Sequence, residues 1–118
     1  MDEPEALGGT NTGMNPVELL LSALGGCVTI SLLTFAPKFD VKIQDCRVEL
    51  EGDLDPDGFL GKNPAARVGV SHVRFTIHLK TDAPREKVQQ LYDYFEKHCP
   101  VADTLKGVPI SGVYKIDA

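Results

Sequence analysis

The sequence predicts an α+β fold, in which an antiparallel sheet packs on a long central buried helix and a second helix. Three observations predict it: an uncharged apolar segment at 19–36, two segments of alternating polarity, and a later segment with a single apolar stripe. The chain has 118 residues, close to the usual size of one domain. We therefore expect residues 1–118 to form a single domain.

The long apolar segment, Leu19–Ala36, needs to be distinguished from a membrane span. Its 18 residues carry no charge, but they include two Gly, two Ser and two Thr, and Pro37 follows directly. The other predicted elements are half-buried strands that need a packing partner. We interpret the segment as the buried core helix of a cytoplasmic protein and expect no membrane partner.

The start of this helix has several specific signals. Asn15 can cap it, Pro16 occupies the first helical position, where its missing N–H costs nothing, and Glu18 stands at the third position of a capping box. Pro37 stops the helix. Apolar residues occur all round the segment, which predicts burial on every side.

Two strands and a loop follow. Residues 45–54 alternate, and we expect a bulge near Gln44 because the residues before it are out of phase. Residues 55–66 form a loop rich in Gly, Pro and Asp. Residues 71–80 alternate again. The predicted inward-facing side chains are Cys46, Val48, Leu50, Leu54, Val73, Phe75, Ile77 and Leu79.

The C-terminal third supplies the remaining elements. A helix starts at Pro84 and runs to about His98, with an apolar stripe that docks it on the surface of the domain. A short helical turn at 100–106 is closed by Gly107. A final strand follows; its alternating residues are Val108, Ile110, Tyr114 and Ile116.

The composition limits the classes of partner. The chain has 12 Lys and Arg against 17 Asp and Glu, a formal net charge of −5. An acidic chain without a basic run is a poor partner for a phosphate backbone, so we expect no nucleic acid. Residues 1–15 are acidic and Gly-rich rather than basic and then apolar, so they do not predict a signal peptide.

The three cysteines differ in their surroundings. They are too few for a secreted disulfide framework, and no CxxC spacing predicts a zinc site. Cys46 alternates with apolar strand residues and fits core packing. Cys27 follows Gly25 and Gly26 in the apolar helix, where it is either a small core residue or a sulfur that another segment or a substrate approaches closely.

Cys99 precedes Pro100 at the start of the short helical turn. The free N–H groups there stabilise a thiolate, which predicts a lowered pKa for Cys99, although the residue can equally be a simple cap. If the fold brings Cys27 and Cys99 together, one thiol could attack a peroxide and the other could condense with the resulting sulfenic acid. His72 and His78 fit a solvated strand face.

Two segments resemble the OsmC/Ohr family of thiol-dependent hydroperoxide reductases. They are Asn15–Cys27 (NPVELLLSALGGC) and His98–Val101 (HCPV). The resemblance implies an intertwined homodimer that reduces organic hydroperoxides with a thiol reductant and needs no cofactor or metal. It makes Cys27 the peroxidatic and Cys99 the resolving cysteine, which reverses the ranking from the helix dipole alone.

The chain departs from the family pattern in two respects. The resemblance implies an arginine from strands ahead of the long helix, strands that we expect this chain to lack, and a glutamate directly after the Asn-Pro pair. Val17 stands at the glutamate position, and Glu18, roughly opposite Cys27 on the helix, fits capping better. The other candidate arginines are Arg47, Arg67 and Arg74. These departures favour a generic OsmC-like branch.

Two alternatives to a peroxidase stay open. The first is a non-catalytic dimeric protein that keeps the fold and binds a small molecule. The second, weaker one is a metal–thiolate site formed by Cys27, Cys99 and His98.

Overall fold

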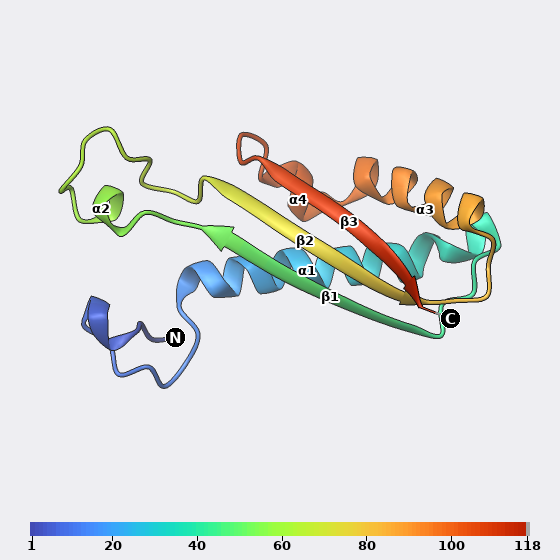
Figure 1. Cartoon of the computed structure of the whole chain (residues 1–118), viewed down its shortest axis with the longest axis horizontal. Helices are drawn as coiled ribbons and strands as arrows, with labels where there is room; N and C mark the ends of the chain where they lie inside the picture. Colours follow the sequence, from blue (N-terminus) through green and yellow to red (C-terminus); the bar gives the residue numbers. More distant parts are fainter. Residues whose placement is uncertain (118) are drawn as a thin grey trace.

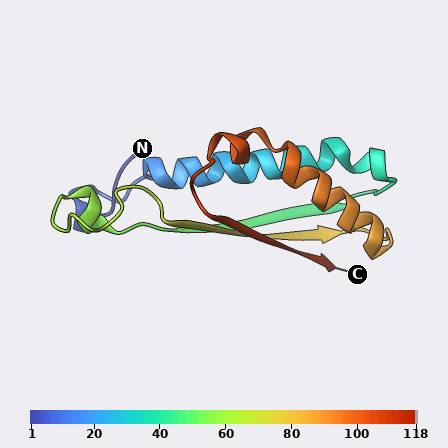
Figure 2. The same ribbon diagram turned by 90° about the horizontal axis from the view of Figure 1, so that it is seen from above.

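A computed structural model describes residues 1–117, which form a layer of helices over one face of a sheet (Figures 1 and 2). The helices are α1 (Pro16–Phe35), α3 (Arg85–His98) and α4 (Pro100–Thr104), and the strands are β1 (Asp45–Asp53), β2 (His72–Lys80) and β3 (Ile110–Asp117). Shorter elements are the 3₁₀ helices η1 (Glu5–Leu7) and η2 (Ala36–Phe39) and the helical turn α2 (Pro56–Phe59). The predicted α+β class is confirmed.

The start of α1 forms as its sequence predicts. The Asn15 side chain accepts a hydrogen bond of 2.8 Å from the Glu18 N–H, and the Glu18 carboxylate accepts one of 3.1 Å from the Asn15 N–H. This reciprocal capping box, with Pro16 at the first turn, satisfies donors that the helix leaves free. The helix ends at Phe35, and Pro37 lies in the 3₁₀ turn η2 that follows.

The sheet has the order β1-β2-β3 and is mixed rather than antiparallel throughout. β1 and β2 pair antiparallel, with Val48 opposite Ile77. β2 and β3 pair parallel, with Ile77 also opposite Tyr114. The expectation of an antiparallel sheet is wrong for this second pair because α3 and α4 form a crossover that returns the chain to the same end of the sheet.

The face of the sheet that meets the helices is apolar, as the alternation predicts. All four inward residues of β2 are buried, and those of β1 pack against the same core. Leu54 is an exception, because β1 ends at Asp53 and Leu54 is 36 % exposed in the following loop. On the helix side the buried stripe of α3 is the predicted one: Val88, Leu91, Tyr92 and Phe95.

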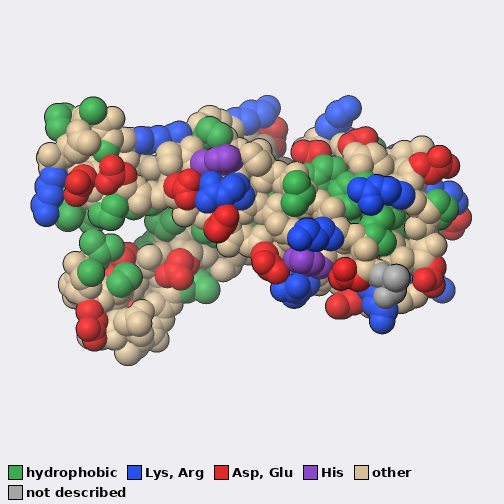
Figure 3. All heavy atoms as spheres, in the orientation of Figure 1, with side chains coloured by type: hydrophobic (Ala, Val, Ile, Leu, Met, Phe, Trp, Pro, Cys, Tyr) green, Lys and Arg blue, Asp and Glu red, His purple; other side chains and the backbone are tan. Residues whose placement is uncertain are grey.

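The opposite face of the sheet carries charge and is open to solvent (Figure 3). Arg74 binds Asp53 at 2.8 Å and Glu51 at 2.9 Å. His78 lies 3.0 Å from Glu49, and His72 hydrogen-bonds Ser111 at 2.8 Å. The two histidines therefore lie on the polar strand face, as predicted.

The segment ahead of α1 folds back on itself at one end of the molecule (Figure 1). The Asp2 carboxylate accepts hydrogen bonds from the side chains and backbone N–H groups of Thr10 and Thr12. These bonds, that of the Thr10 hydroxyl first, hold the pKa of the Asp2 carboxyl below its usual range. Residues 1–15 contain η1 and no strand.

Burial of α1 differs from the prediction. One side packs on the sheet and α3, where Leu24, Val28 and Leu32 are at most 1 % exposed. The other side is open in the single chain, with Ile30 66 % and Leu33 49 % exposed. The all-round apolar pattern therefore overstates burial within one chain, because the described elements cover only one side of this helix.

The two glycines of α1 face different surroundings. A Cβ at Gly25 would lie 2.6 Å from the Leu50 side chain, so this glycine lets α1 approach β1 closely. A Cβ at Gly26 would meet nothing within 4 Å. The prediction that another segment approaches this pair is confirmed at Gly25, whereas Gly26 faces open space.

The chain is elongated. Its principal extents are 50 × 29 × 21 Å and its radius of gyration is 16.7 Å, whereas a compact domain of this length has about 13–14 Å. By length and composition, residues Pro16–Phe39 could cross a membrane. Their position against the sheet and α3 is that of a core helix in a globular domain.

Candidate functional site

Cys27 and Cys99, which are 72 residues apart in sequence, meet in the folded chain. Their Sγ atoms lie 3.3 Å apart, with the Cys99 thiol placed to donate a hydrogen bond to the Cys27 sulfur. Both residues are free thiols. At this separation the two sulfurs need to move by little more than 1 Å to reach the length of a disulfide bond.

Three elements bring the two sulfurs together. Cys27 lies in the middle of α1, one helical position from the buried Val28. Cys99 lies between α3 and α4, where its backbone is extended (φ −86°, ψ 109°) and Pro100 starts the next helix. The contacts of α3 and α4 with α1 place this junction over the centre of α1, so the tertiary fold rather than local sequence builds the pair.

The protonation of Cys99 differs from the expectation based on the helix dipole. Burial raises the pKa of the Cys99 thiol above its ordinary value, while the N–H groups of Ala102 and Val101 act in the opposite direction. Cys99 is only 2 % exposed, so the cost of desolvating a thiolate exceeds the stabilisation by the first turn of α4. Cys99 therefore holds its proton and acts as the donor of the pair.

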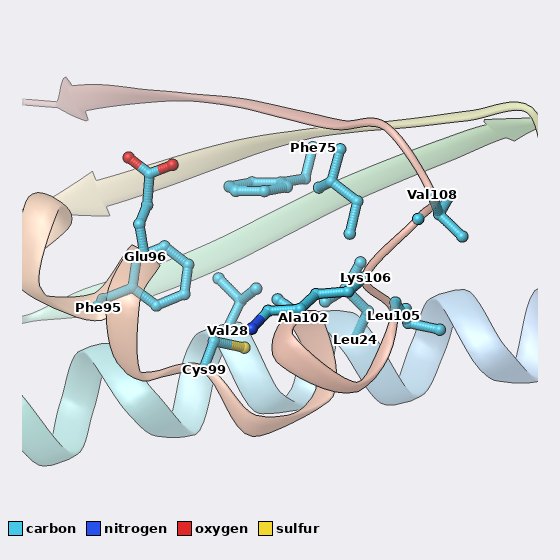
Figure 4. Close-up of a pocket in the computed structure, with 12 residues that line it drawn as sticks. Leu24, Val28, Phe75, Phe95, Glu96, Cys99, Ala102, Leu105, Lys106 and Val108 are labelled. Atoms are coloured by element: carbon cyan, nitrogen blue, oxygen red, sulfur yellow. The ribbon is translucent and has the colours of Figure 1, made fainter.

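A cavity of about 330 Å³ opens beside Cys99 (Figure 4). Its lining comes from both layers, with Phe75 on the sheet side and Leu24 and Val28 on the α1 side. Glu96 and Lys106 supply the charged groups of the lining, and burial followed by the nearby Asp93 raises the pKa of the Glu96 carboxyl. The cavity combines apolar and charged lining and is large enough for a small molecule next to the Cys99 sulfur.

Cys46 and His98, the other candidate residues, make their contacts with groups other than the two sulfurs. Cys46 packs against the core from β1, and burial raises the pKa of its thiol. His98 stacks on Tyr94, with ring centroids 4.0 Å apart, and its Nδ1 lies 2.7 Å from the Tyr94 carbonyl oxygen. Within residues 1–117 no three His, Cys, Asp or Glu side chains are grouped so that they could hold a metal.

The candidate arginines have other partners in the single chain. Arg47 pairs with Glu49 at 2.5 Å, and both it and Arg74 lie on the sheet face opposite α1. Arg67 donates to the Gly107 carbonyl oxygen at 3.3 Å. Glu18 is engaged in the capping box. Sequence reasoning thus found the sulfur pair, and none of these groups lies against it within one chain.

Sequence reasoning missed one polar neighbour of the pair. Ser31 is 6 % exposed, and its Oγ lies 3.9 Å from the Cys27 Sγ, one turn along α1. The i,i+4 spacing of a serine and a cysteine in an apolar helix is the signal that could have identified it.

The family model of OsmC-like proteins matches residues 9–111, most of the chain. The chain belongs to the OsmC-like protein family. The match includes both cysteines of the pair and strands β1 and β2, and it stops at Ser111, the second residue of β3. No curated protein matches the chain.

Solved structures confirm the OsmC-like fold. An OsmC-like protein from Mycoplasma pneumoniae superimposes with a TM-score of 0.82 at 19 % identity, over 98 % of this chain and 79 % of the other. An organic hydroperoxide resistance protein from Elizabethkingia anophelis gives 0.75 at 17 % identity, over 98 % and 78 %. An organic hydroperoxide resistance protein OsmC from Legionella pneumophila superimposes with a TM-score of 0.70 at 16 % identity. The alignment covers 98 % of this chain and 79 % of the other.

Proposed function

We propose that this OsmC-like protein is a thiol-dependent hydroperoxide reductase that uses Cys27 and Cys99 in a disulfide cycle. The observation that carries the proposal is the 3.3 Å separation of the two sulfurs beside a cavity of about 330 Å³. Structural neighbours that are described as organic hydroperoxide resistance proteins support an organic hydroperoxide as the substrate. We place this activity in the cytoplasm, as part of an oxidative stress response.

In the proposed cycle Cys27 is the nucleophile. Its thiolate attacks the peroxide O–O bond, becomes a sulfenic acid, and releases the alkoxide, which takes up a proton to leave as an alcohol. The Cys99 sulfur then attacks the Cys27 sulfur and displaces the hydroxyl group as water, so that a disulfide forms. Two thiol groups of an external reductant return both cysteines to the reduced state.

The division of roles follows from the hydrogen bond between the two sulfurs. Cys99 donates and Cys27 accepts, and burial keeps the proton on Cys99. The arrangement therefore supports Cys27 as the sulfur that attacks and leaves Cys99, which holds its proton, to act in the second step.

We further propose that two copies pair through the open face of α1. Leu19, Leu20, Ile30 and Leu33 are each more than 40 % exposed on this helix. A groove of about 450 Å³ between α1 and β1, lined by Gly26, Ile30 and Val48 among others, runs along the same side. A second α1 packed there would cover the apolar face.

Trapping of the disulfide tests the cycle directly. One equivalent of cumene hydroperoxide added to the reduced protein is expected to link the peptides that contain Cys27 and Cys99, with Cys46 left as a free thiol. Mass spectrometry of an alkylated, nonreduced digest measures this. A protein that consumes no peroxide and forms no such link, beside a positive control that does, would contradict the proposed function.

The second step is expected to depend on pH. Because burial raises the pKa of Cys99, this residue is largely protonated at neutral pH, and its thiolate fraction grows about tenfold per pH unit. The rate of disulfide formation after a peroxide pulse should therefore rise steeply from pH 6 to pH 8, which quenched-flow alkylation measures. A rate that is flat over this range would show that Cys99 does not attack as a thiolate.

The cavity favours one alternative, a non-catalytic protein that binds a small molecule. Cumyl alcohol, which cannot oxidise a thiol, is a suitable probe. In this alternative Cys27→Ser leaves its affinity unchanged, whereas Ala102→Leu, which fills part of the lining, weakens binding. Titration calorimetry measures both, and the disulfide experiment separates this function from the reductase.

A further inference from the structure

The side chain of Ser31 is the polar group of α1 that faces the reactive sulfur pair. Ser31 is 6 % exposed, and among the described residues Ser31 and Thr81 are the buried polar side chains. Its Oγ lies 3.9 Å from the Cys27 Sγ, and this sulfur is its hydrogen-bond partner. A buried hydroxyl needs such a partner because an unsatisfied one is costly.

Two other helical hydroxyls, those of Thr29 and Thr104, behave differently. Thr29 donates to the Gly25 carbonyl oxygen at 2.9 Å, and Thr104 donates to that of Pro100 at 2.8 Å. Both follow the usual pattern, in which a hydroxyl bonds to the carbonyl four residues earlier. Ser31 also lies four residues after its partner, but its contact is with the side chain of Cys27 instead.

We propose that Ser31 is a positioning residue, which donates a hydrogen bond to the Cys27 thiolate and so increases the fraction of Cys27 that can attack a peroxide. In the thiol form either atom can be the donor, but a thiolate has no proton, so the hydroxyl must donate. Cys27 then accepts from two sides, from Cys99 at 3.3 Å and from Ser31. Cys99 is a titratable side chain in direct contact with Cys27.

This role rests on the proposed function, in which Cys27 is the nucleophile. The measurement, however, needs no peroxide. The rate at which iodoacetamide alkylates Cys27 is followed against pH in the full chain, and mass spectrometry reads the peptide that contains Cys27 separately from those of Cys46 and Cys99. The midpoint of this profile reports the ease with which Cys27 loses its proton.

Ser31→Ala is expected to move the midpoint up by about one pH unit, the size of one hydrogen bond to a charged group. Ser31→Thr, which retains the hydroxyl, should stay near the wild-type midpoint. Thr34→Ala, which removes an exposed hydroxyl of the same helix, should leave it unchanged. If Ser31→Ala does not fold, Ser31→Thr and Ser31→Val supply the comparison, because they share a shape and differ in the hydroxyl.

A midpoint that stays the same in Ser31→Ala, or in Ser31→Val against Ser31→Thr, would overturn the proposal. That result would mean that the Ser31 hydroxyl does not stabilise the Cys27 thiolate. If the midpoint moves and the protein still reduces no peroxide, the role of Ser31 stands and the proposed function fails. If the protein reduces peroxide and the midpoint does not move, the proposed function stands and the role of Ser31 fails.

Discussion

Replacement of Cys27 by serine is expected to lower peroxide reduction by at least about a thousandfold, because the alcohol cannot replace the thiolate that attacks the O–O bond. Cys99→Ser should behave differently: a first equivalent of cumene hydroperoxide is still reduced, after which the enzyme stops with Cys27 as a sulfenic acid. Consumption of the peroxide in the presence of dithiothreitol, and the product formed in a single turnover without it, measure the two effects.

Cys46→Ser is the matched control. Cys46 packs against the core from β1 and takes no part in the sulfur pair, so this variant should retain the wild-type rate. Equal losses in all three variants would indicate a general effect on folding. Full activity in Cys27→Ser would remove the proposed nucleophile.

The second large effect is expected on assembly. Ile30 is 66 % exposed on the open face of α1, and a dimer through that face buries it twice. In Ile30→Lys each copy would lose about 2 kcal/mol of the free energy of burying the isoleucine side chain. Because the dimer contains two copies, the dissociation constant would rise about a thousandfold. Light scattering at micromolar concentration should then give the chain mass of 12.8 kDa, against twice that mass for the wild type.

Val113→Lys is the control for this experiment. Val113 is 56 % exposed on β3, away from the helix layer, so its replacement makes a similar change of polarity on another surface. It should remain dimeric. A monomeric wild type would contradict the pairing, and an equal effect of both variants would show that α1 is not the contact.

Local signals in the sequence were sufficient to predict most helices and strands. The capping box of Asn15 and Glu18 depends on four consecutive residues, and the inward residues of β2 follow from strict alternation. The pairing direction of β3 cannot be predicted from alternation, because parallel and antiparallel strands alternate in the same way. Likewise the apolar surface of α1 says nothing about which of its sides is covered within the chain.

In the candidate site, too, local sequence predicts some features and the tertiary fold determines the others. The motifs around Cys27 and Cys99 identified the pair through a family resemblance, whereas spacing alone could not bring residues 72 positions apart into contact. The acidity of Cys99 was misjudged because the helix start is visible in the sequence and the depth of burial is not. Ser31 was missed because a serine in an apolar helix carries no signal until its neighbour is known.

The long separation of the two sulfurs along the chain has a thermodynamic consequence. A covalent link between them would close a loop of 72 residues in the unfolded chain, and the lost freedom of that loop corresponds to about 4 kcal/mol of added stability. The proposed cycle would then alternate between a looser reduced form and a tighter oxidised form. Each turnover would thus change how strongly the whole domain resists heat.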